Sequence, residues 1–380
     1  MPQSRLRAVF MRGGTSKAVI FRRADLPTDE AAWPAIFSRV MGSPDPNMRQ
    51  LDGMGGGISS LSKICIIGPP SRADADVDYT FAQVGVDSDI VDFGSNCGNM
   101  SSAVGPFAVE EGFVARPNGD RAVVRIHNTN TKKIIVSRFH MDGEYAAVEG
   151  DLVLDGVAGS GSPIKLDFLS PAGAKTGKLL PTGAPLQMLD VPGLGAIAAS
   201  MIDAAAACVF VRAADLGCTA TERPDAMERD AALMEKLEAI RRAASLAMGI
   251  TKDLDAAGRA MASPKVAMVA APAEFRTLSG RAMAPGDTDI MIRMISSGQP
   301  HRAVPLTGSL CLAVACRVPG SIPNMIAGGT GDVRIGHPSG MVLVAADIRV
   351  GADGIAANAA TVYRTARRLF QGEVFYRTPV

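Results

Sequence analysis

The sequence predicts an α+β fold of two topologically similar halves, each a mixed β-sheet wrapped around a central helix. Short apolar runs typical of strands outnumber helical stretches, and 40 Gly and 24 Pro residues imply many turns. Four segments of the first half return in the second half in the same order. A chain of 380 residues also exceeds the size at which one core keeps growing. We therefore expect two domains, residues 1–184 and 185–380.

Strands are predicted where apolar residues alternate or form short β-rich runs. These runs are Leu6–Phe10, Ala18–Phe21, Lys63–Ile67, Tyr79–Val84, Val123–His127 and Lys133–Ser137. Apolar periodicity predicts helices over Asp29–Val40, Gly98–Phe113 and Asp225–Met248. Because the helices are few and scattered, the pattern favours sheets wrapped around helices over a regular βαβ alternation.

The internal repeat consists of four matched pairs. VIFRRADLP (19–27) matches VFVRAADLG (209–217), LSKICIIGP (61–69) matches SPKVAMVAAP (263–272), VVRIHNTNTKKIIV (123–136) matches DVRIGHPSGMVLV (332–344), and the helix start at 94–98 matches 307–309. The second pair aligns Lys63 with Lys265. GKLLPTGAP, near residue 185, is predicted to link the halves. A duplicated fold of this kind is expected to hold its active site in the cleft between the halves.

Composition and charge exclude several classes of partner. A net charge of +1 and 5% aromatic residues give no electrostatic or stacking footprint for nucleic acid or an anionic membrane. No apolar run reaches the length of a signal peptide or of a bilayer span. Six cysteines without C-x-x-C or zinc-finger spacing, and four scattered histidines, predict free thiols in a reducing compartment and no metal site. We expect a cytoplasmic protein, with a homodimer as the default assembly.

Cys97 is the first candidate catalytic residue. It lies in SNCGNMSSAVGPFAVEEG (Ser95–Gly112), where small and polar residues precede an apolar helical periodicity. A helix start here would place the thiol at the positive end of the helix dipole and lower its pKa. The unpaired amides of that turn, with Asn96, Gly98 and Asn99 around them, are suited to hold a carboxylate or an enolate. The alternative is a buried structural cysteine, which the polar neighbours disfavour.

Lys63, preceded by Ser62, is the second candidate. Glycines at positions 53 and 55–57 lead into the strand that Lys63 opens. A dinucleotide-binding fingerprint requires a helix after its glycines, so nucleotide binding is excluded. Partial burial would depress the pKa of Lys63 and make it a usable base. A lone lysine is usually a solvated surface group, but the alignment with Lys265 favours a function.

Three further segments were weighed for ligand binding. MRGGTSKA (Met11–Ala18) offers backbone amides, Thr15 and Ser16 to a carboxylate, or is a plain β-hairpin turn. GAKTGKLL (173–180) fails as a phosphate loop, because its glycine spacing is one residue short and a leucine replaces Ser or Thr. His337, in GHPSG, either binds a carboxylate or packs in its turn.

A lysine and a cysteine in the first half, with hydroxyls and amides from both halves, form the remaining set of reactive groups. G-x-S-x-G is absent, so a hydrolase elbow is disfavoured. The set suits proton abstraction next to a carbonyl and proton delivery elsewhere. It does not suit redox or phosphoryl chemistry, and no cofactor is expected.

On these residues the chain resembles the PrpF family of isomerases over nearly its whole length. The resemblance rests on MRGGTSK (11–17), MGSPD (41–45), the Ser-Lys pair at 62–63, DADVDYTFAQV (74–84), NCGN (96–99), GPFA (105–108), LLPTG (179–183), GHPSG (336–340) and RTARRL (364–369). DADVDYTFAQV, IHNTNT (126–131) and TGKLLPTG (176–183) are most similar to the family's methylitaconate Δ-isomerases; methylaconitate isomerisation and oxalomesaconate tautomerisation are its other activities.

The resemblance implies a diaminopimelate-epimerase-like fold with the substrate between its halves. It places the family's catalytic lysine on Lys63 and its catalytic cysteine on Cys97. The implied reaction is a 1,3-allylic proton transfer on an unsaturated di- or tricarboxylate such as methylitaconate, methylaconitate, aconitate or oxalomesaconate, without a cofactor. Which of the two groups is the base depends on substrate and direction. The expected substrate contacts are Gly14, Thr15, Ser16, Ser62, Asn96, Gly98, Asn99, Lys265, Gly308, Ser309 and His337.

Departures from the family pattern leave two other hypotheses open. Gly57 and Leu61 stand where relatives commonly carry Ala and Thr, which bears on the shape of the pocket and hence on the substrate. Amino-acid epimerases of this fold use a second cysteine on the other half; here the aligned stretch is Thr307–Ser309, with Cys311 a residue or two beyond. The alternatives are a two-cysteine racemase or epimerase using Cys97 and Cys311, and a non-catalytic carboxylate-binding relative.

Overall fold

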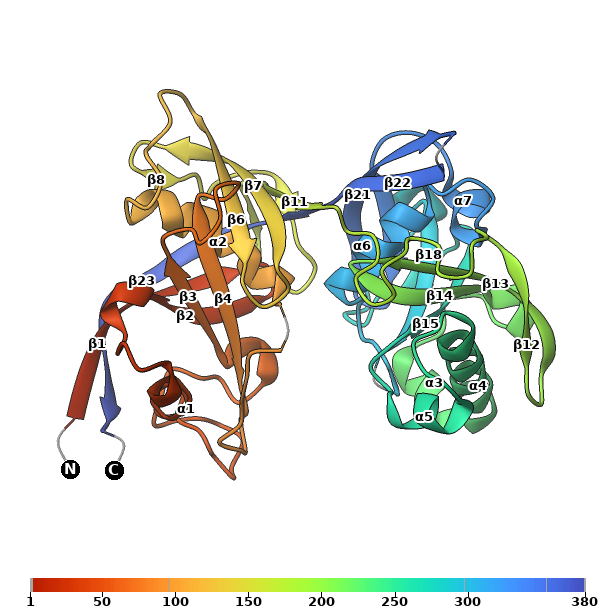
Figure 1. Ribbon diagram of the computed structural model, residues 1–380, viewed down its shortest axis with the longest axis horizontal. Helices are drawn as coiled ribbons and strands as arrows, with labels where there is room; N and C mark the ends of the chain where they lie inside the picture. Colours follow the sequence, from red (N-terminus) through yellow and green to blue (C-terminus); the bar gives the residue numbers. More distant parts are fainter. Residues whose placement is uncertain (1–2, 95, 297, 353, 379–380) are drawn as a thin grey trace. The chain divides into compact units, whose positions relative to one another are not determined.

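The computed structural model describes residues 3–94, 96–296, 298–352 and 354–378. The chain forms two compact units (Figure 1): unit 1 is Met1–Asp167 with Tyr363–Val380, and unit 2 is Phe168–Val362. This division differs from the predicted boundary at 184/185, and the C-terminal segment belongs to the first unit. The reason is that β23 (Ala366–Arg377) pairs antiparallel with β1 (Gln3–Gly13) along its whole length.

Unit 1 is built on a mixed sheet in the order β23–β1–β2–β3–β4–β6–β7. The β2–β3 and β4–β6 pairs are parallel and the others antiparallel. All six predicted strands are confirmed. The other strands are β2 (Ser16–Arg22), β3 (Lys63–Gly68), β4 (Val77–Val84), β5 (Val91–Asp92), β6 (Arg121–Asn128), β7 (Lys133–Asp142), β8 (Tyr145–Ala146), β9 (Leu152–Val153), β10 (Ser160–Gly161) and β11 (Ile164–Leu169), which continues into unit 2.

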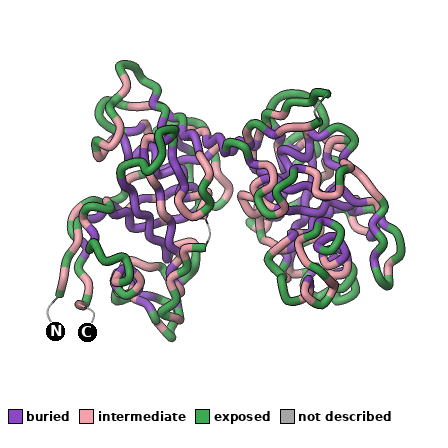
Figure 2. The backbone as a smooth tube through the Cα atoms, viewed as in Figure 1, coloured by how far each residue is buried: buried purple, intermediate pink, exposed green. Residues whose placement is uncertain are grey.

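Helix α2 (Gly98–Glu110) is the centre of unit 1. Every residue from Met100 to Val109 is buried, as the purple trace in Figure 2 shows. The helix contacts β1, β2, β3, β6, β7, β8 and β23. A helix that is apolar on all sides is stable only when enclosed. Gly105 permits the close approach to β7, because a Cβ there would lie 2.5 Å from Ser137 Oγ.

Unit 2 repeats this arrangement. Its sheet runs β12–β13–β14–β15–β18–β20–β21–β22, with β14–β15 and β18–β20 parallel. Helix α6 (Leu306–Ala315) is buried from Gly308 onward and contacts β13, β14 and β21. The strands are β12 (Gln187–Val191), β13 (Gly195–Ala204), β14 (Ala206–Arg212), β15 (Lys265–Ala270), β16 (Phe275–Arg276), β17 (Ala282–Met283), β18 (Ile290–Ser296), β19 (Gln299–Pro300), β20 (Val333–His337), β21 (Gly340–Gly351) and β22 (Gly354–Arg364).

The internal repeat is visible in the strand pairings. In each unit an antiparallel pair is followed by a parallel, an antiparallel, a parallel and an antiparallel pairing. Lys63 opens β3, and Lys265 opens the corresponding strand β15. The predicted fold class, two similar α+β halves each wrapped around a central helix, is therefore confirmed.

The remaining helices differ in part from the prediction. Helix α1 (Trp33–Met41) begins later than predicted, after a 3-10 turn, Glu30–Ala32. The helix predicted over Asp225–Met248 is two helices, α3 (Pro224–Arg229) and α4 (Ala231–Ala247), followed by α5 (Leu254–Arg259); α7 (Ile322–Ala327) follows α6. The break lies at Asp230, whose backbone is non-helical and whose side chain caps α4. No helix among the described residues is long and apolar enough to cross a membrane.

Replacing Asp230 with Ala is expected to lower the free energy of unfolding by about 1 kcal/mol. The substitution removes the hydrogen bond that the Leu233 amide donates to Asp230 Oδ1, in which N and Oδ1 lie 3.0 Å apart. Urea unfolding measures the change. The control is Asp225→Ala, which removes an exposed carboxylate that pairs with Arg223 and Arg229 in the first turn of α3 and should stay within about 0.5 kcal/mol of the parent. Equal losses in both variants would contradict the cap's role.

Candidate active site

Lys63 lies at the edge of the unit 1 sheet where β1 turns into β2. The hairpin turn is Gly14–Thr15. The parallel β2–β3 register places Val19 beside Ile64, so Lys63 lies one residue nearer the turn. The predicted lysine and the predicted glycine–hydroxyl turn therefore share one edge of the sheet.

Helix α2 starts at the same edge, with Cys97 as its N-cap. Cys97 has an extended backbone, and its carbonyl accepts from the Ser101 amide at 3.0 Å. The predicted helix start is confirmed. Within the described structure the Cys97 side chain makes no capping hydrogen bond, so the amides of 98–100 receive no acceptor from it. These amides and the helix dipole favour an anion beside the partly buried thiol.

Lys63 is held by a glutamine that the sequence analysis did not select. The lysine is 7% exposed, and its Nζ donates to Oε1 of Gln83, the residue opposite it on β4. Its ammonium also lies 5.1 Å from the centre of the Phe81 ring. The Gln83 amide nitrogen donates to the carbonyls of Ser59 (3.0 Å) and Ser62 (2.9 Å). These bonds turn Oε1 toward the lysine, and strand register is the signal that would have identified Gln83.

The segment leading to Cys97 is anchored by the IHNTNT stretch. Strand β5 pairs with the end of β4, and the chain then runs through residues 93–96 to the thiol. Ser95 of the predicted motif lies outside the described residues. Asparagine amides hold the rest, through bonds from Asn130 Nδ2 to the carbonyls of Phe93 (2.7 Å) and Phe81 (2.9 Å), and from Asn128 Nδ2 to Asn96 Oδ1 (3.3 Å).

A buried Cys65–Tyr79 pair lies between Lys63 and Cys97. The Tyr79 hydroxyl donates to the Cys97 carbonyl at 3.5 Å and lies 3.9 Å from the Cys65 sulfur. Burial raises the pKa of the Cys65 thiol, with smaller effects from the charges of Cys97, which raises it, and Lys63, which lowers it. Burial likewise raises the pKa of Tyr79. Both groups therefore stay neutral, while Lys63 and Cys97 lie within electrostatic range of the same thiol.

The hairpin turn is locked onto the start of α2. Asn99 Nδ2 donates to Thr15 Oγ1 at 3.0 Å. Gly14 has φ +51°, and a Cβ there would lie 2.4 Å from Asn99 Oδ1, so the position requires glycine. Arg12 Nη1 donates to the carbonyls of Gly14 and Thr365, each at 3.0 Å. The structure thus brings together the predicted Gly14, Thr15 and Asn99.

Two predicted substrate contacts, Ser62 and Ser16, are buried. Ser62 is fully buried, and its hydroxyl donates to Gln50 Oε1 at 2.6 Å. The glycine-rich loop wraps around the same glutamine: Gly57 N donates to Gln50 Oε1 at 2.9 Å, and a Cβ on Gly55 would lie 2.2 Å from that atom. The Ser62 hydroxyl is therefore bonded within unit 1, and its predicted contact with substrate stays a prediction. Ser16 is 3% exposed.

In unit 2, Lys265 repeats the environment of Lys63. Its Nζ donates to Ser296 Oγ at 3.0 Å, so the hydrogen-bond acceptor is again a residue of the adjacent antiparallel strand. Burial lowers the pKa of His301, and the nearby charge of Lys265 lowers it further. This makes His301 a neutral imidazole beside a cation near pH 7.

The other predicted residues of unit 2 are largely internal. Ser309 is fully buried and donates to the Leu306 carbonyl at 2.8 Å. A Cβ on Gly308 would lie 2.6 Å from the sulfur of Met294. Gly308 lies in the first turn of α6, and the substrate contacts predicted for Gly308 and Ser309 stay predictions. His337 is 5% exposed, and its Nδ1 accepts from the Ser339 amide at 3.2 Å.

Cys311 lies inside unit 2. It is fully buried in α6, and its sulfur donates to the Ile202 carbonyl at 3.4 Å. Burial raises the pKa of this thiol well above its usual value, and Cys208 raises it further. The N-cap of α6 is Pro305, so the position of α6 equivalent to Cys97 carries no thiol.

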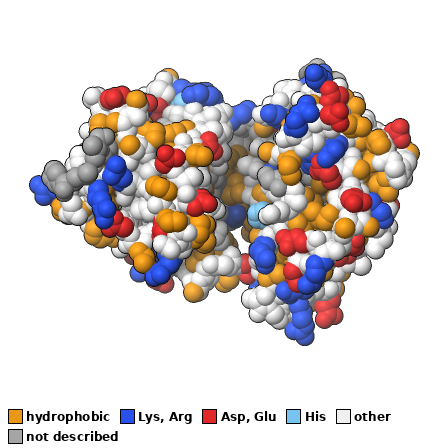
Figure 3. Space-filling view, turned by 90° about the horizontal axis from the view of Figure 1, so that it is seen from below, with side chains coloured by type: hydrophobic (Ala, Val, Ile, Leu, Met, Phe, Trp, Pro, Cys, Tyr) orange, Lys and Arg blue, Asp and Glu red, His pale blue; other side chains and the backbone are white. Residues whose placement is uncertain are grey.

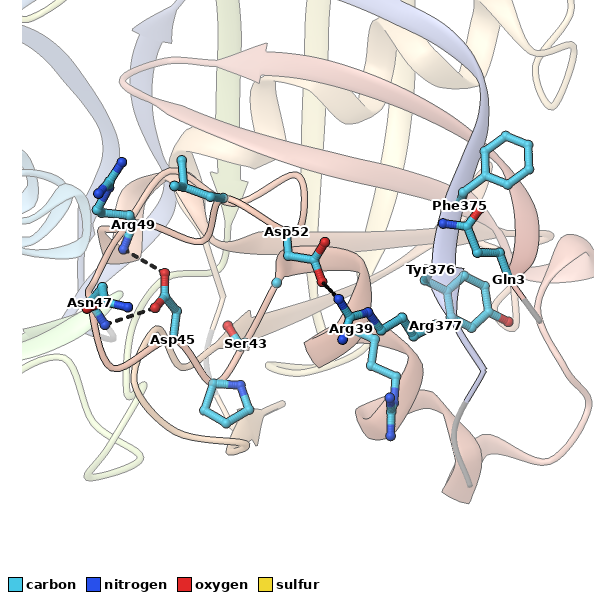
Figure 4. Close-up of a pocket in the computed structure, with 13 residues that line it drawn as sticks. Gln3, Arg39, Ser43, Asp45, Asn47, Arg49, Asp52, Phe375, Tyr376 and Arg377 are labelled. Atoms are coloured by element: carbon cyan, nitrogen blue, oxygen red, sulfur yellow. Dashed lines mark hydrogen bonds and ion pairs between the residues drawn. The ribbon is translucent and has the colours of Figure 1, made fainter. Parts of the chain in front are cut away.

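A polar cavity of about 510 Å³ lies at the other end of β1 (Figure 4). It is lined by residues that include Gln3, Arg39 and Arg377, the last paired with Asp52 at 3.0 Å. The strand rises roughly 33 Å from Gln3, which lines the cavity, to Gly13 before the hairpin turn, at about 3.3 Å per residue. Neither Lys63, Cys97 nor the hairpin turn lines this cavity. Among the described residues, no group of three His, Cys, Asp or Glu side chains is placed to hold a metal ion.

Known proteins similar to this chain cover nearly all of it. The family model described as PrpF protein matches residues 3–377. The 2-methyl-aconitate isomerase of Shewanella oneidensis is 39% identical over 100% of this chain and 98% of its own. The 3-methylitaconate isomerase of Eubacterium barkeri is 39% identical over 98% and 97%. The (4E)-oxalomesaconate Delta-isomerase of Novosphingobium sp. (strain KA1) is 36% identical over 97% and 96%.

Solved structures give the same picture. A crystal structure of methylitaconate-delta-isomerase superposes with a TM-score of 0.90, at 38% identity and over 99% of this chain and 96% of that chain. A hydroxyproline epimerase from Agrobacterium vitis has a TM-score of 0.51 at 12% identity, over 99% and 94%. The second likeness concerns the fold alone.

Replacing Asn130 with Ala is expected to loosen the segment before Cys97. The variant loses the two carbonyl contacts of Nδ2 and the bond from the Phe81 amide to Oδ1, 2.8 Å long. The free energy of unfolding should fall by about 1–3 kcal/mol, and Cys97 should react faster with iodoacetamide, as read by peptide mass spectrometry. Asn118→Ala, at an exposed position, should change neither. Unchanged Cys97 reactivity in a destabilised Asn130 variant would contradict the anchoring role.

Proposed function

The chain belongs to the PrpF family, as its sequence motifs predicted, and from this premise we propose that it is an isomerase of an unsaturated di- or tricarboxylate. The relatives are named for isomerisation of methylaconitate, methylitaconate and oxalomesaconate. All of these acids are di- or tricarboxylates that contain a carbon–carbon double bond. A 1,3-allylic proton shift is the reaction class that moves such a double bond without net oxidation or reduction, so the proposal requires no redox cofactor.

Lys63 and Cys97 are proposed to carry the two proton transfers. One group removes a proton from the carbon γ to a carboxylate, and the electron pair delocalises into that carboxylate as a dienolate. The other group delivers a proton to the α carbon, which completes the double-bond shift. The observation that carries this proposal is that an amine held by Gln83 and a thiol at the N-cap of α2 share one sheet edge. Which of them is the base stays open and depends on substrate and direction.

The amides of the α2 first turn are proposed to stabilise the dienolate, because their N–H dipoles face the position where negative charge develops. Lys265 of unit 2, a cation beside a neutral His301, is proposed to bind a further carboxylate. Other residues proposed to contact the substrate are Gly14, Thr15, Ser16, Asn96, Gly98, Asn99 and His337. Ser62, Gly308 and Ser309 also remain proposed contacts; the hydroxyls of Ser62 and Ser309 are bonded within their own units.

The proposed partner is a small carboxylate. The chain has a net charge of +1, and acidic and basic side chains are interspersed on the face shown in Figure 3, so no nucleic-acid partner is proposed. A cytoplasmic location and a homodimeric assembly remain predictions from the sequence.

The two-cysteine racemase is the weaker hypothesis. It requires a second thiol exposed to substrate, whereas Cys311 is fully buried and bonded to a backbone carbonyl. A non-catalytic carboxylate binder is also disfavoured, because both proposed proton-transfer groups, Lys63 and Cys97, are present.

Replacing Lys63 with Gln or Cys97 with Ser is expected to reduce isomerisation at least 100-fold, because each removes one proton-transfer group. The assay follows deuterium incorporation into methylitaconate, 2-methylaconitate, cis-aconitate or oxalomesaconate in D2O by NMR. Cys218→Ser, which removes another partly buried thiol, is the matched control and should retain activity. Full activity in the Lys63 or Cys97 variant would refute the mechanism.

Cys311→Ser is expected to leave isomerisation within about threefold of the parent, since a fully buried thiol does not reach substrate. The same variant tested for α-proton exchange on amino acids distinguishes the racemase hypothesis. If exchange on an amino acid occurred in the parent and vanished in both the Cys97 and Cys311 variants, the chain would be a racemase.

A further inference from the structure

Arg364 is a buried cation of unit 1 without an anionic partner. It is 9% exposed. Its Nε donates to Asn99 Oδ1 at 3.1 Å and its Nη1 to the Tyr363 carbonyl at 2.9 Å, and both acceptors are neutral. Among the described residues, no carboxylate forms an ion pair with it. Up to three of its five N–H groups are left for a ligand.

Two other arginines with little exposure pair with carboxylates. Arg241, 1% exposed, pairs with Glu238 at 2.6 Å, and the half-buried Arg368 pairs with Glu110 at 2.7 Å and with Glu111 at 2.9 Å. Arg293, 3% exposed, donates to the carbonyls of Glu222 and Ile292; burial lowers its pKa, and the nearby charge of Glu222 raises it. A guanidinium that is buried without an anion nearby is energetically costly. Arg364 therefore resembles a buried cation that forms an ion pair only when an anionic ligand binds.

The position of Arg364 indicates where that anion would lie. The Arg364 Nε donates to Asn99, in the first turn of α2. The Arg364 side chain also lies against the hairpin turn, because a Cβ on Gly14 would lie 3.1 Å from the Arg364 Cδ. Burial lowers the pKa of Arg364 to about 10, and the negative charge of Cys97 raises it. Arg364 thus stays protonated near pH 7 and lies within electrostatic range of the thiol. Beside it are the first-turn amides, which receive no acceptor from the Cys97 side chain.

We propose that Arg364 is a substrate-binding residue, which together with the amides of residues 98–100 binds one carboxylate of the substrate next to Cys97. The inference rests on the proposed function and deepens it, because it identifies the group that fixes the carbon facing the thiol. A guanidinium and a helix N-terminus together suit the planar, bidentate geometry of a carboxylate. They also oppose the charge that this carboxylate gains as the dienolate forms.

The test measures protection of Cys97 by tricarballylate, a saturated tricarboxylate that cannot isomerise. Cys97 alkylation by iodoacetamide is followed by peptide mass spectrometry while tricarballylate is varied. The parent is compared with Arg364→Gln, Arg364→Lys and the control Arg367→Gln, which removes an exposed arginine near the start of the next strand, β23. Circular dichroism and Tm of the ligand-free variants verify the fold.

The half-protecting concentration should rise about 10- to 100-fold in Arg364→Gln. It should rise less in Arg364→Lys, which keeps the positive charge but loses the paired N–H donors of the guanidinium. It should be unchanged in Arg367→Gln. Equal half-protecting concentrations in the parent and the Arg364 variants would overturn the proposal, as would a parent that tricarballylate does not protect. If Arg364→Gln does not fold, Arg364→Lys is judged by the same criterion.

The outcome separates this inference from the proposed reaction. Arg364-dependent protection in a parent that exchanges no allylic proton would support the carboxylate subsite and refute the isomerase. Isomerisation by the parent with unchanged protection in Arg364→Gln would refute the subsite and leave the isomerase standing.

Discussion

The enclosure of α2 by the sheet of unit 1 determines where the reactive groups can lie. Residues 100–109 of this helix are buried on every side, so its polar backbone groups emerge only at its ends. At the N-terminal end the helix meets the β1–β2 turn, where Gly14 leaves room for Asn99. The apolar packing thus ends at one sheet edge. The polar groups that lie together there are the amides of the first turn, the Cys97 thiol and the Arg364 guanidinium. The position of the candidate site follows from packing before any catalytic requirement is considered.

Neutral amide side chains do most of the positioning around that edge. Gln50 holds the glycine-rich loop, Gln83 holds Lys63, and Asn128 and Asn130 hold the segment before Cys97. Each uses an oxygen and a nitrogen at once, which fixes its orientation. Carboxylates in these places would add charges within a few ångströms of the lysine and thiol, and would shift the protonation of both. Amides provide the rigidity without that effect.

Local pattern was enough for six strands of unit 1, for the central helix α2 and for Cys97 at its start, because alternation and periodicity report burial directly; the start of α6 was indicated only by the internal repeat. It was not enough for features that depend on long-range pairing. The contact between β1 and β23 joins opposite ends of the chain, so neither the true limits of unit 1 nor the placement of Arg364 beside Asn99 could be read from neighbours in sequence. The partner of Lys63 required the β3–β4 register. The bond from the Ser62 hydroxyl to Gln50 could not be predicted either, because a serine before a lysine gives no sign of a distant glutamine.

The two units share a backbone plan but differ at the atoms that matter for proton transfer. Both place a lysine at the start of the corresponding strand. In both, the lysine donates a hydrogen bond to a polar side chain on the next antiparallel strand, Gln83 in unit 1 and Ser296 in unit 2. The helix starts differ: α2 is capped by a thiol, whereas α6 is capped by Pro305, which has no ionisable group. Beside Lys265 lies an imidazole whose pKa is lowered, so the lysine is the cation there near pH 7. Such a pair is suited to hold a carboxylate in place, which agrees with the proposal that unit 1 supplies the acid/base groups and unit 2 a binding charge.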